Sequence, residues 1–197
     1  MRKIPTAAVA MAAFLMPLAL HAQFSDSYNF LKAVKDRDGS ETTKILGKPG
    51  NIVNTHDSSS GETVLHILAH DRDLTWMGFM LAKGAKPDER DNRGDTPLGI
   101  ATQLNWTEGV ELLLKYGASI DLANSNGETP LIIATHNDDV ALVRLLLEMG
   151  ANPDKTDHIS GTSARTYARQ NTRDPALAEA FTTTRAHARK PQEGPHL

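Results

Sequence analysis

The sequence contains no cysteine, which excludes disulfide bonds, thiolate metal sites and cysteine-based catalysis. The absence of thiols also suits export to an oxidising compartment, because no thiol would need protection there. Aromatic residues make up only 5% of the 197 residues, too few for a large core of the usual kind. An array of short stacked helices built on Leu, Ile and Ala would need no more than this.

The sequence also lacks the short motifs of common enzymes. It has no G-x-S-x-G, no Walker loop and no H-E-x-x-H. His66 and His70 stand four residues apart, a spacing that could place two imidazoles on one helix face for zinc. The later counterpart of His70, His136, has Ile132 in place of a second histidine. We therefore expect no metal, no cofactor and no catalytic residue.

The first 22 residues are typical of an export signal. Arg2 and Lys3 precede an uncharged apolar run over residues 4–20, and a small residue, Ala22, follows it. The run is short for a membrane span, which needs about 20 residues. We predict cleavage after Ala22, a periplasmic location in a bacterium and no membrane span in the mature chain. An uncleaved N-terminal anchor is the alternative.

Charge also bears on the choice of partner. Without Arg2 and Lys3 the 21 basic residues fall to 19, against 24 acidic residues, so the mature chain has a net charge of −5. A negative chain without a basic face argues against nucleic acid as the main partner.

A period of 33 residues organises most of the chain, since the stretch Gly61 to Ala85 recurs at Gly94 to Ala118 and at Gly127 to Ala151. Each copy opens with a glycine that suits a turn, followed two residues later by a threonine that can cap a helix. A proline at the first helical position follows in two copies. A glycine near the end of each copy is typical of a helix C-cap. Each copy therefore predicts a pair of short helices.

Apolar residues within each copy follow helical spacing. Leu81, Leu114 and Leu147 are predicted to anchor the second helix of the pair. Replacing Leu114 with Ala is expected to cost about 2–5 kcal/mol of stability.

GETPLIIA, which begins at Gly127, and LVRLLLEMGANPD, which begins at Leu142, resemble the ankyrin repeat. The family pattern is G-x-T-P-L-H-x-A followed by V-x-L-L-L-x-x-G-A, and its period is the same. The resemblance implies an all-α solenoid of helix-turn-helix repeats joined by β-hairpin-like tips, with about five repeats in this chain. It also places His66 at the family's histidine, which orders the tip through local hydrogen bonds, so we favour that role over a zinc site.

The predicted boundaries give a signal peptide at 1–22, an ankyrin-repeat domain at 23–181 and a disordered basic tail at 182–197. The tail has no apolar periodicity and contains two prolines. The domain divides into a polar N-terminal capping repeat, three regular repeats and a C-terminal capping repeat: 23–60, 61–93, 94–126, 127–160 and 161–181. Helices are expected at 30–38 and 41–46 in the first cap and at 174–181 in the last.

In the ankyrin family the variable positions line the concave face, beside the turn glycine and at the end of the first helix. Carried over by position, they give the candidate partner-binding residues Ser59, Ser60, Glu62, His70, Asp71, Asn92, Arg93, Asp95, Gln103, Leu104, Ser125, Asn126, Glu128, His136 and Asn137. Glu62, Asp95 and Glu128 place one carboxylate at one position in each repeat. They form either an acidic ladder for a basic partner segment or favourable charges at helix N-termini, and the second explanation is favoured.

Two aromatic residues extend this candidate surface. Trp106 stands where the family has a histidine, and it is either an exposed binding hot spot or packed over the adjacent helix. Tyr116, just before the C-cap glycine, is assigned to the same surface. Trp76 offers a second, weaker patch on the convex side.

The function expected from these residues is a non-enzymatic, monomeric module that binds an unknown protein partner in the periplasm through its tips and concave first-helix face. One alternative is an inhibitor or stabiliser of a specific periplasmic enzyme. Another is an envelope-surface binding protein that uses Arg185, Arg189 and Lys190 of the tail. An enzyme with a carboxylate pair in the groove is a third, and no set of residues supports it.

Overall fold

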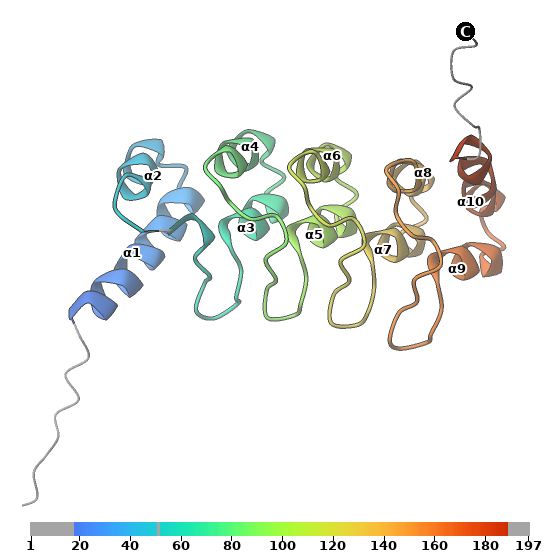
Figure 1. Ribbon diagram of the computed structural model, residues 1–197, viewed down its shortest axis with the longest axis horizontal. Helices are drawn as coiled ribbons and strands as arrows, with labels where there is room; N and C mark the ends of the chain where they lie inside the picture. Colours follow the sequence, from blue (N-terminus) through green and yellow to red (C-terminus); the bar gives the residue numbers. More distant parts are fainter. Residues whose placement is uncertain (1–17, 51, 189–197) are drawn as a thin grey trace, which may run out of the picture.

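A computed structural model describes residues 18–50 and 52–188, and this part of the chain forms one elongated array of helix pairs (Figure 1). The second helices of the pairs form the upper row in Figure 1, the first helices lie below them, and the connecting loops project at the bottom. The pairs are α1 (Leu18–Lys35) with α2 (Gly39–Leu46), α3 (Val64–His70) with α4 (Leu74–Ala82), α5 (Pro97–Gln103) with α6 (Thr107–Lys115), α7 (Pro130–His136) with α8 (Val140–Glu148), and α9 (Ala164–Gln170) with α10 (Pro175–Ala188). A short 3-10 turn, Ile52–Asn54, follows α2.

The first and last helices are longer than the sequence predicts. α1 begins at Leu18 and ends at Lys35, where the sequence predicts a helix over 30–38. α10 continues to Ala188, which corrects the prediction of disorder from residue 182. Beyond its first residue neither helix contains proline or glycine, so the backbone continues even where the apolar period is lost. Residues 1–17 of the predicted signal peptide and residues 189–197 of the predicted tail lie outside the described residues.

Capping residues explain where the first helices begin. Thr96, Thr129 and Ser163 each accept a hydrogen bond from the backbone N–H three residues further on. Pro97 and Pro130 follow two of these caps, where the missing N–H costs nothing. The starts after Thr96 and Thr129 agree with the predicted ones.

Aspartate caps most of the second helices in the same way. Asp38, Asp73 and Asp139 accept the backbone N–H three residues on at the starts of α2, α4 and α8. α6 differs, because Trp106 stands at its N-cap and makes no side-chain capping bond. The first turn of α6 is therefore stabilised by the packing of Trp106 and not by a side-chain cap.

In α6 and α8 the core lies one residue earlier than predicted, whereas in α4 the predicted Leu81 is buried. Leu113 and Leu146 are fully buried, whereas Leu114 and Leu147 are only half-buried. Val110, also fully buried, stands one turn before Leu113 and fixes the inward face of α6. Leu114 consequently lies at the edge of the core, and its replacement should cost less than the sequence predicts.

The loops between the pairs form tight tips without β-strands. Within residues 18–50 and 52–188 the recorded strand pairing is one isolated bridge, between Thr156 and Ser163. A backbone bond from Asp91 N–H to the Asp95 carbonyl (3.0 Å) closes one tip, and the Asp91 carboxylate accepts the N–H groups of Arg93 and Asp95 across the turn. Three other residues hold the same place in their tips: Asp57, Asn124 and Asp157.

Neighbouring tips pack too closely for side chains at the turn glycine. Gly94 has a φ of 77°, in the left-handed region, and a Cβ there would lie 2.3 Å from the Ser125 hydroxyl of the next tip. The glycine that opens each copy is therefore required both by its backbone conformation and by the approach of the next repeat.

Candidate functional site

The predicted binding residues lie mostly on one surface, which we call the tip face: the tips together with the C-terminal ends of the first helices. Ten of them are exposed: Ser59, His70, Asp71, Asn92, Arg93, Gln103, Ser125, Asn126, His136 and Asn137. Four more are partly exposed: Ser60, Glu62, Leu104 and Glu128. Stacking of the repeats brings them together although they are far apart in the sequence.

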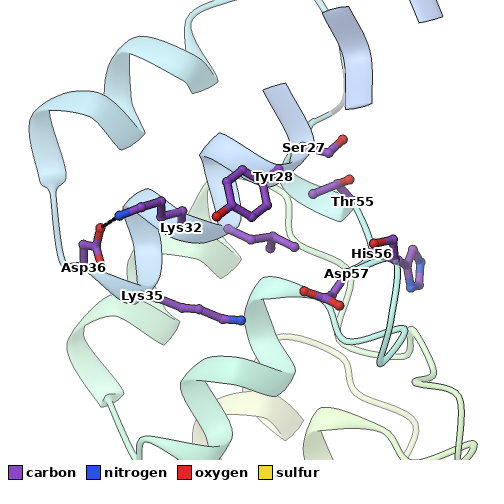
Figure 2. A pocket seen from close by; sticks show the side chains of 10 residues that line it. Ser27, Tyr28, Lys32, Lys35, Asp36, Thr55, His56 and Asp57 are labelled. Atoms are coloured by element: carbon purple, nitrogen blue, oxygen red, sulfur yellow. Dashed lines mark hydrogen bonds and ion pairs between the residues drawn. The ribbon is translucent and has the colours of Figure 1, made fainter. Parts of the chain in front are cut away.

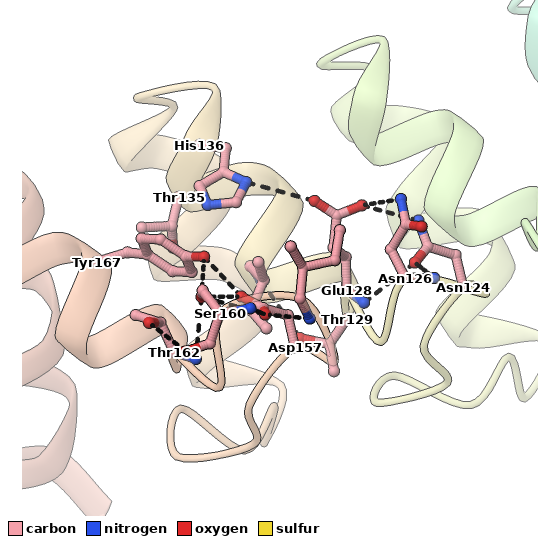
Figure 3. Close-up of polar contacts among 12 residues, drawn as sticks. Asn124, Asn126, Glu128, Thr129, Thr135, His136, Asp157, Ser160, Thr162 and Tyr167 are labelled. Atoms are coloured by element: carbon pink, nitrogen blue, oxygen red, sulfur yellow. Dashed lines mark hydrogen bonds and ion pairs between the residues drawn. The ribbon is translucent and has the colours of Figure 1, made fainter.

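The carboxylates at the base of the tips face the last residues of the first helices. His70 Nε2 lies 3.2 Å from Glu62 Oε1, and His136 Nδ1 lies 3.6 Å from Glu128 Oε1 (Figure 3). Glu128 also accepts hydrogen bonds from Asn124 Nδ2 at 3.0 Å and from a second asparagine of the tip. Two of the three predicted ladder positions therefore already have donors from their own chain.

Asp95, the middle position of the predicted ladder, is only 5% exposed. Its carboxylate receives Asn124 Nδ2 at 3.3 Å and Gln103 Nε2 at 3.4 Å, and Arg93 Nε lies 3.4 Å away. A buried carboxylate that is satisfied from three sides stabilises the stacked tips and has little surface to offer a partner. These contacts favour the structural explanation of the three carboxylates over a binding ladder.

Trp106 is buried, which corrects its placement on the binding surface. Its side chain is 7% exposed and belongs to the main hydrophobic core. The ring lies against Gly109 so closely that a Cβ there would come within 2.1 Å of it. Tyr116 is 43% exposed but ends α6, roughly 15 Å along the axis from Trp106, so the two do not form one surface.

His66 has the local role that the sequence favours. It is fully buried, its Nδ1 accepts the Thr63 backbone N–H at 3.0 Å, and its Nε2 donates to the Asp95 carbonyl at 3.0 Å. Burial lowers its pKa and keeps the ring neutral, as the accepting Nδ1 requires. Both ring nitrogens are occupied, so His66 cannot join His70 on a zinc ion. No cluster of three or more potential metal ligands occurs among the described residues.

Polar contacts between repeats occupy the turns that join first and second helices. Arg37 Nη2 and Nε lie 2.9 and 2.7 Å from the carboxylates of Asp71 and Asp73 in the next repeat. Asn137 Nδ2 donates to Asn105 Oδ1 at 2.8 Å in the preceding one. Asp71 and Asn137, both predicted to bind a partner, are therefore also used in stacking. The sequence gives no signal for these contacts, because they depend on how one repeat lies on the next.

A hollow of about 430 Å³ lies at the N-terminal end of the tip face, between α1 and the first tip (Figure 2). Tyr28, which is 68% exposed, and Lys35 line it beside the tip residue Asp57. Hydrogen bonds from the Ser59 side chain and from backbone N–H groups, assisted by Lys35, lower the pKa of Asp57 to about 2. The sequence missed this hollow, because the polarity of the first repeat was explained by its position at the end of the array.

A second hollow, of about 320 Å³, lies at the C-terminal end of the tip face, beside His136 and Tyr167. The two rings meet edge to face, with centroids 4.3 Å apart (Figure 3). The Tyr167 hydroxyl donates to Asp157 at 2.6 Å and holds the pKa of that carboxyl well below its ordinary value. Tyr167 is not among the binding residues predicted from the sequence, so its part in this surface was missed.

Comparison with known proteins agrees with this geometry. Residues 30–121 and 65–157 match a sequence model of ankyrin repeats (3 copies), and together the matches span well over half of the chain. Oxysterol-binding protein homolog 1 of Saccharomyces cerevisiae is 32% identical over 80 residues, which is 39% of this chain and 7% of the yeast protein. Since this chain spans so small a part of that relative, the likeness concerns the shared segment alone.

Proposed function

Because the chain belongs to the ankyrin-repeat family, whose repeats generally mediate protein–protein interaction, we propose that it is an exported, non-enzymatic module that binds a protein partner in the periplasm through its tip face. The family is typically an interaction module without catalysis. No helix within the described ranges is long and apolar enough to cross a bilayer. The two divergent end pairs, α1–α2 and α9–α10, are proposed to cap the three regular repeats, which gives about five repeats in all.

One observation carries the choice of the tip face. The last residue of each first helix is exposed and polar, and it differs between neighbouring repeats. These five residues are Lys35, His70, Gln103, His136 and Gln170. Side chains that differ between neighbouring repeats of one scaffold are the arrangement expected of a recognition surface, since fold alone leaves function open.

The two hollows suggest along which line of the tip face a partner would lie. One lies beside Lys35 and the other beside His136, at opposite ends of the row. An extended segment of a partner could lie along the row and place a side chain in each hollow. The stacked repeats hold both hollows in place before binding, which limits the ordering entropy lost on association.

The role of these five exposed residues can be tested by a pull-down from periplasmic extract with two matched baits. One carries Lys35→Ala, Gln103→Ala and Gln170→Ala, at the exposed last residues of three first helices. The control bait carries Glu111→Ala, Lys115→Ala and Glu148→Ala on the outer helices. We expect one protein to be recovered by the unchanged chain and the control but lost with the row variant. Equal recovery by all three baits would contradict the tip face, and circular dichroism checks that each bait is folded.

Export and processing have their own measurement. The intact mass of the chain purified from a bacterial periplasm should correspond to an N-terminus at Gln23, as expected from cleavage after Ala22. A chain that keeps residues 1–22, or that stays in the membrane fraction, would replace this proposal with an N-terminal anchor.

The alternatives concern the partner or the surface. An inhibitor or stabiliser of one periplasmic enzyme is a special case of tip-face binding, and the recovered protein would reveal it. Envelope binding through the basic tail is tested by truncation after Ala188, because a cut at residue 182 would remove part of α10. Unchanged association of the truncated chain with the envelope would exclude Arg189 and Lys190, and Arg185→Ala tests the remaining basic residue of the tail.

A further inference from the structure

The outer surface of α4 differs from that of the other outer helices. None of the nine residues of α4, LTWMGFMLA, is charged. α2, α6 and α8 each carry two or more charged residues. All four helices lie in the same row of the array (Figure 1), so the difference does not come from their place in the fold.

The difference is concentrated at positions that face solvent. Three outward positions of α4 hold uncharged residues where α6 and α8 hold mostly charged ones: Thr75, Gly78 and Ala82, against Glu108, Glu111 and Lys115 in α6, and Ala141, Arg144 and Glu148 in α8. Because the sibling helices fold with charges at these positions, the repeat itself does not require their absence. An uncharged surface at one repeat indicates that this surface is covered.

The same surface exposes large apolar side chains beside a hollow. Leu74 is 43% and Phe79 is 36% exposed, and Trp76 is half-buried with its ring edge-on to Phe79. A hollow of about 290 Å³ opens between α2 and α4, next to Trp76 and Phe79, with Gly39 and Thr43 on its far side. We call the outward residues of α4 the α4 patch: Leu74, Thr75, Trp76, Gly78, Phe79 and Ala82.

We propose that the α4 patch is the contact surface of a symmetric dimer, covered by the α4 patch of a second copy of this chain. A two-fold axis places a patch against itself, so a charge close to the axis meets its own copy. α4 avoids this repulsion, whereas α6 would set Glu108 and Glu111 against their own copies. The patch also holds protruding side chains and a hollow side by side, as self-complementary packing requires.

The cations near the patch are compatible with this pairing. The Arg37 guanidinium lies 5.8 Å from the Trp76 ring, and the carboxylates of Asp71 and Asp73 neutralise it. Lys83 stands after the end of α4, with its ammonium 5.5 Å from the Phe79 ring, at the rim of the patch. The hollow has room at its far side, since a Cβ added to Gly39 would meet nothing within 4 Å. A side chain of the second copy can therefore enter it.

This dimer departs from the monomer expected from the sequence, and it does not depend on the proposed function. The α4 patch lies on the outer helix row and the tip face on the tips and first helices (Figure 1). A dimer through α4 would leave both tip faces free, so the pair would present two binding surfaces and gain avidity for a repeated partner.

Sedimentation velocity over a range of concentrations tests the proposal on the full chain exported by a bacterial host. The unchanged chain should pass from monomer to dimer as its concentration rises. Ala82→Glu introduces the residue that α8 has at this position and should weaken dimerisation about tenfold or more, because like charges then face each other. Ala141→Glu places the same charge on α8 and should leave the dimer unchanged.

Gly78→Ala separates loss of contact from loss of folding. A Cβ at residue 78 would approach no neighbour closer than Leu112 Cδ2, at 3.9 Å, so the chain can accept it. Alanine favours a helix over glycine, so the melting temperature of the monomer should rise. The added methyl groups would stand between the two copies, so the dimer should weaken in the same variant.

Three outcomes would overturn the dimer. They are a monomer at every concentration, a dimer that Ala82→Glu does not affect, and binding of the monomer to vesicles of phosphatidylglycerol and phosphatidylethanolamine that Ala82→Glu abolishes. The last would mean that a lipid surface covers the α4 patch. Oligomers formed through residues 1–22, if the chain keeps them, would also be unaffected by Ala82→Glu and would therefore count against the dimer.

Discussion

At the scale of single residues, His66 links two repeats through a ring that has to stay neutral. Its Nδ1 accepts the Thr63 N–H of its own repeat, and its Nε2 donates to the Asp95 carbonyl of the next. Gly99 and Ile132 hold the same position in the following copies, so only one repeat uses this device. There the threonine hydroxyls cap the helices without help from a histidine.

The buried His66 should make folding stability depend on pH. Its folded pKa is lowered from an ordinary value of 6.5, so the unfolded chain binds a proton that the folded chain rejects. This contribution is therefore present above about pH 6.5 and is lost as the pH falls below that value. We expect the melting temperature to decrease from pH 7 to pH 5, measured by circular dichroism. His66→Gln should remove part of the decrease, and the exposed His70→Gln should not.

Two adjacent leucines should differ in their contribution to stability. Leu113 is fully buried, and Leu113→Ala should cost about 2–5 kcal/mol because it leaves a cavity in the core. Leu114 is half-buried, so Leu114→Ala should cost clearly less. Urea unfolding of the two variants gives the comparison. Equal losses would mean that the inward face of α6 is assigned wrongly.

At the scale of helices, the sequence predicts the capped beginnings well and the extent of the first and last helices poorly. Thr96 and Thr129 cap helices where the pattern predicts, because a cap is a local contact readable from a few residues. The end of α10 was missed, because an exposed helix can continue without an apolar period until something stops it. Periodicity measures burial, and α10 continues to Ala188 past the buried Phe181.

The candidate site shows the same division between local and distant contacts. The sequence places Gln103 and His136 on an exposed surface, and they are exposed. It does not predict the burial of Asp95, whose partners Arg93, Gln103 and Asn124 come from two repeats. It left two roles open for Trp106, since exposure depends on whether the ring turns toward α6. The repeat pattern determines positions, and stacking determines which side chains remain available.

The stability of α6 should depend on Gly109 in its first turn. Alanine normally stabilises a helix relative to glycine by up to about 1 kcal/mol. At Gly109 the new Cβ would lie 2.1 Å from the Trp106 ring, so Gly109→Ala should instead destabilise the chain by about 1–3 kcal/mol. Thermal unfolding with Gly78→Ala as the matched control, at low protein concentration, measures this. A gain in stability for both variants would show that the Trp106 ring can move.

At the scale of the whole molecule, the array holds together through contacts between neighbours. Helices this short are marginal alone in water, so each pair depends on the next. Hydrogen bonds also join each repeat to the next: Asn54 accepts the Lys86 N–H at 2.7 Å, and Asp88 accepts the Ser119 N–H at 2.7 Å. Asp121 does the same further along the array. The buried residues form one cluster that runs along the array from Phe30 to Phe181, so each part of it is covered by the neighbouring repeats.

The last helix should therefore matter for stability while the residues after it do not. α10 packs against α8 and α9 through Leu177, Ala180 and Phe181, all buried. Truncation after Asp174 removes these residues and uncovers the apolar faces of α8 and α9, so the urea midpoint should decrease. Truncation after Ala188 keeps α10 and should leave the midpoint unchanged. Equal midpoints for both truncations would mean that α9 alone ends the array, with α10 a dispensable appendage. A decrease for both would place a stabilising contact beyond Ala188.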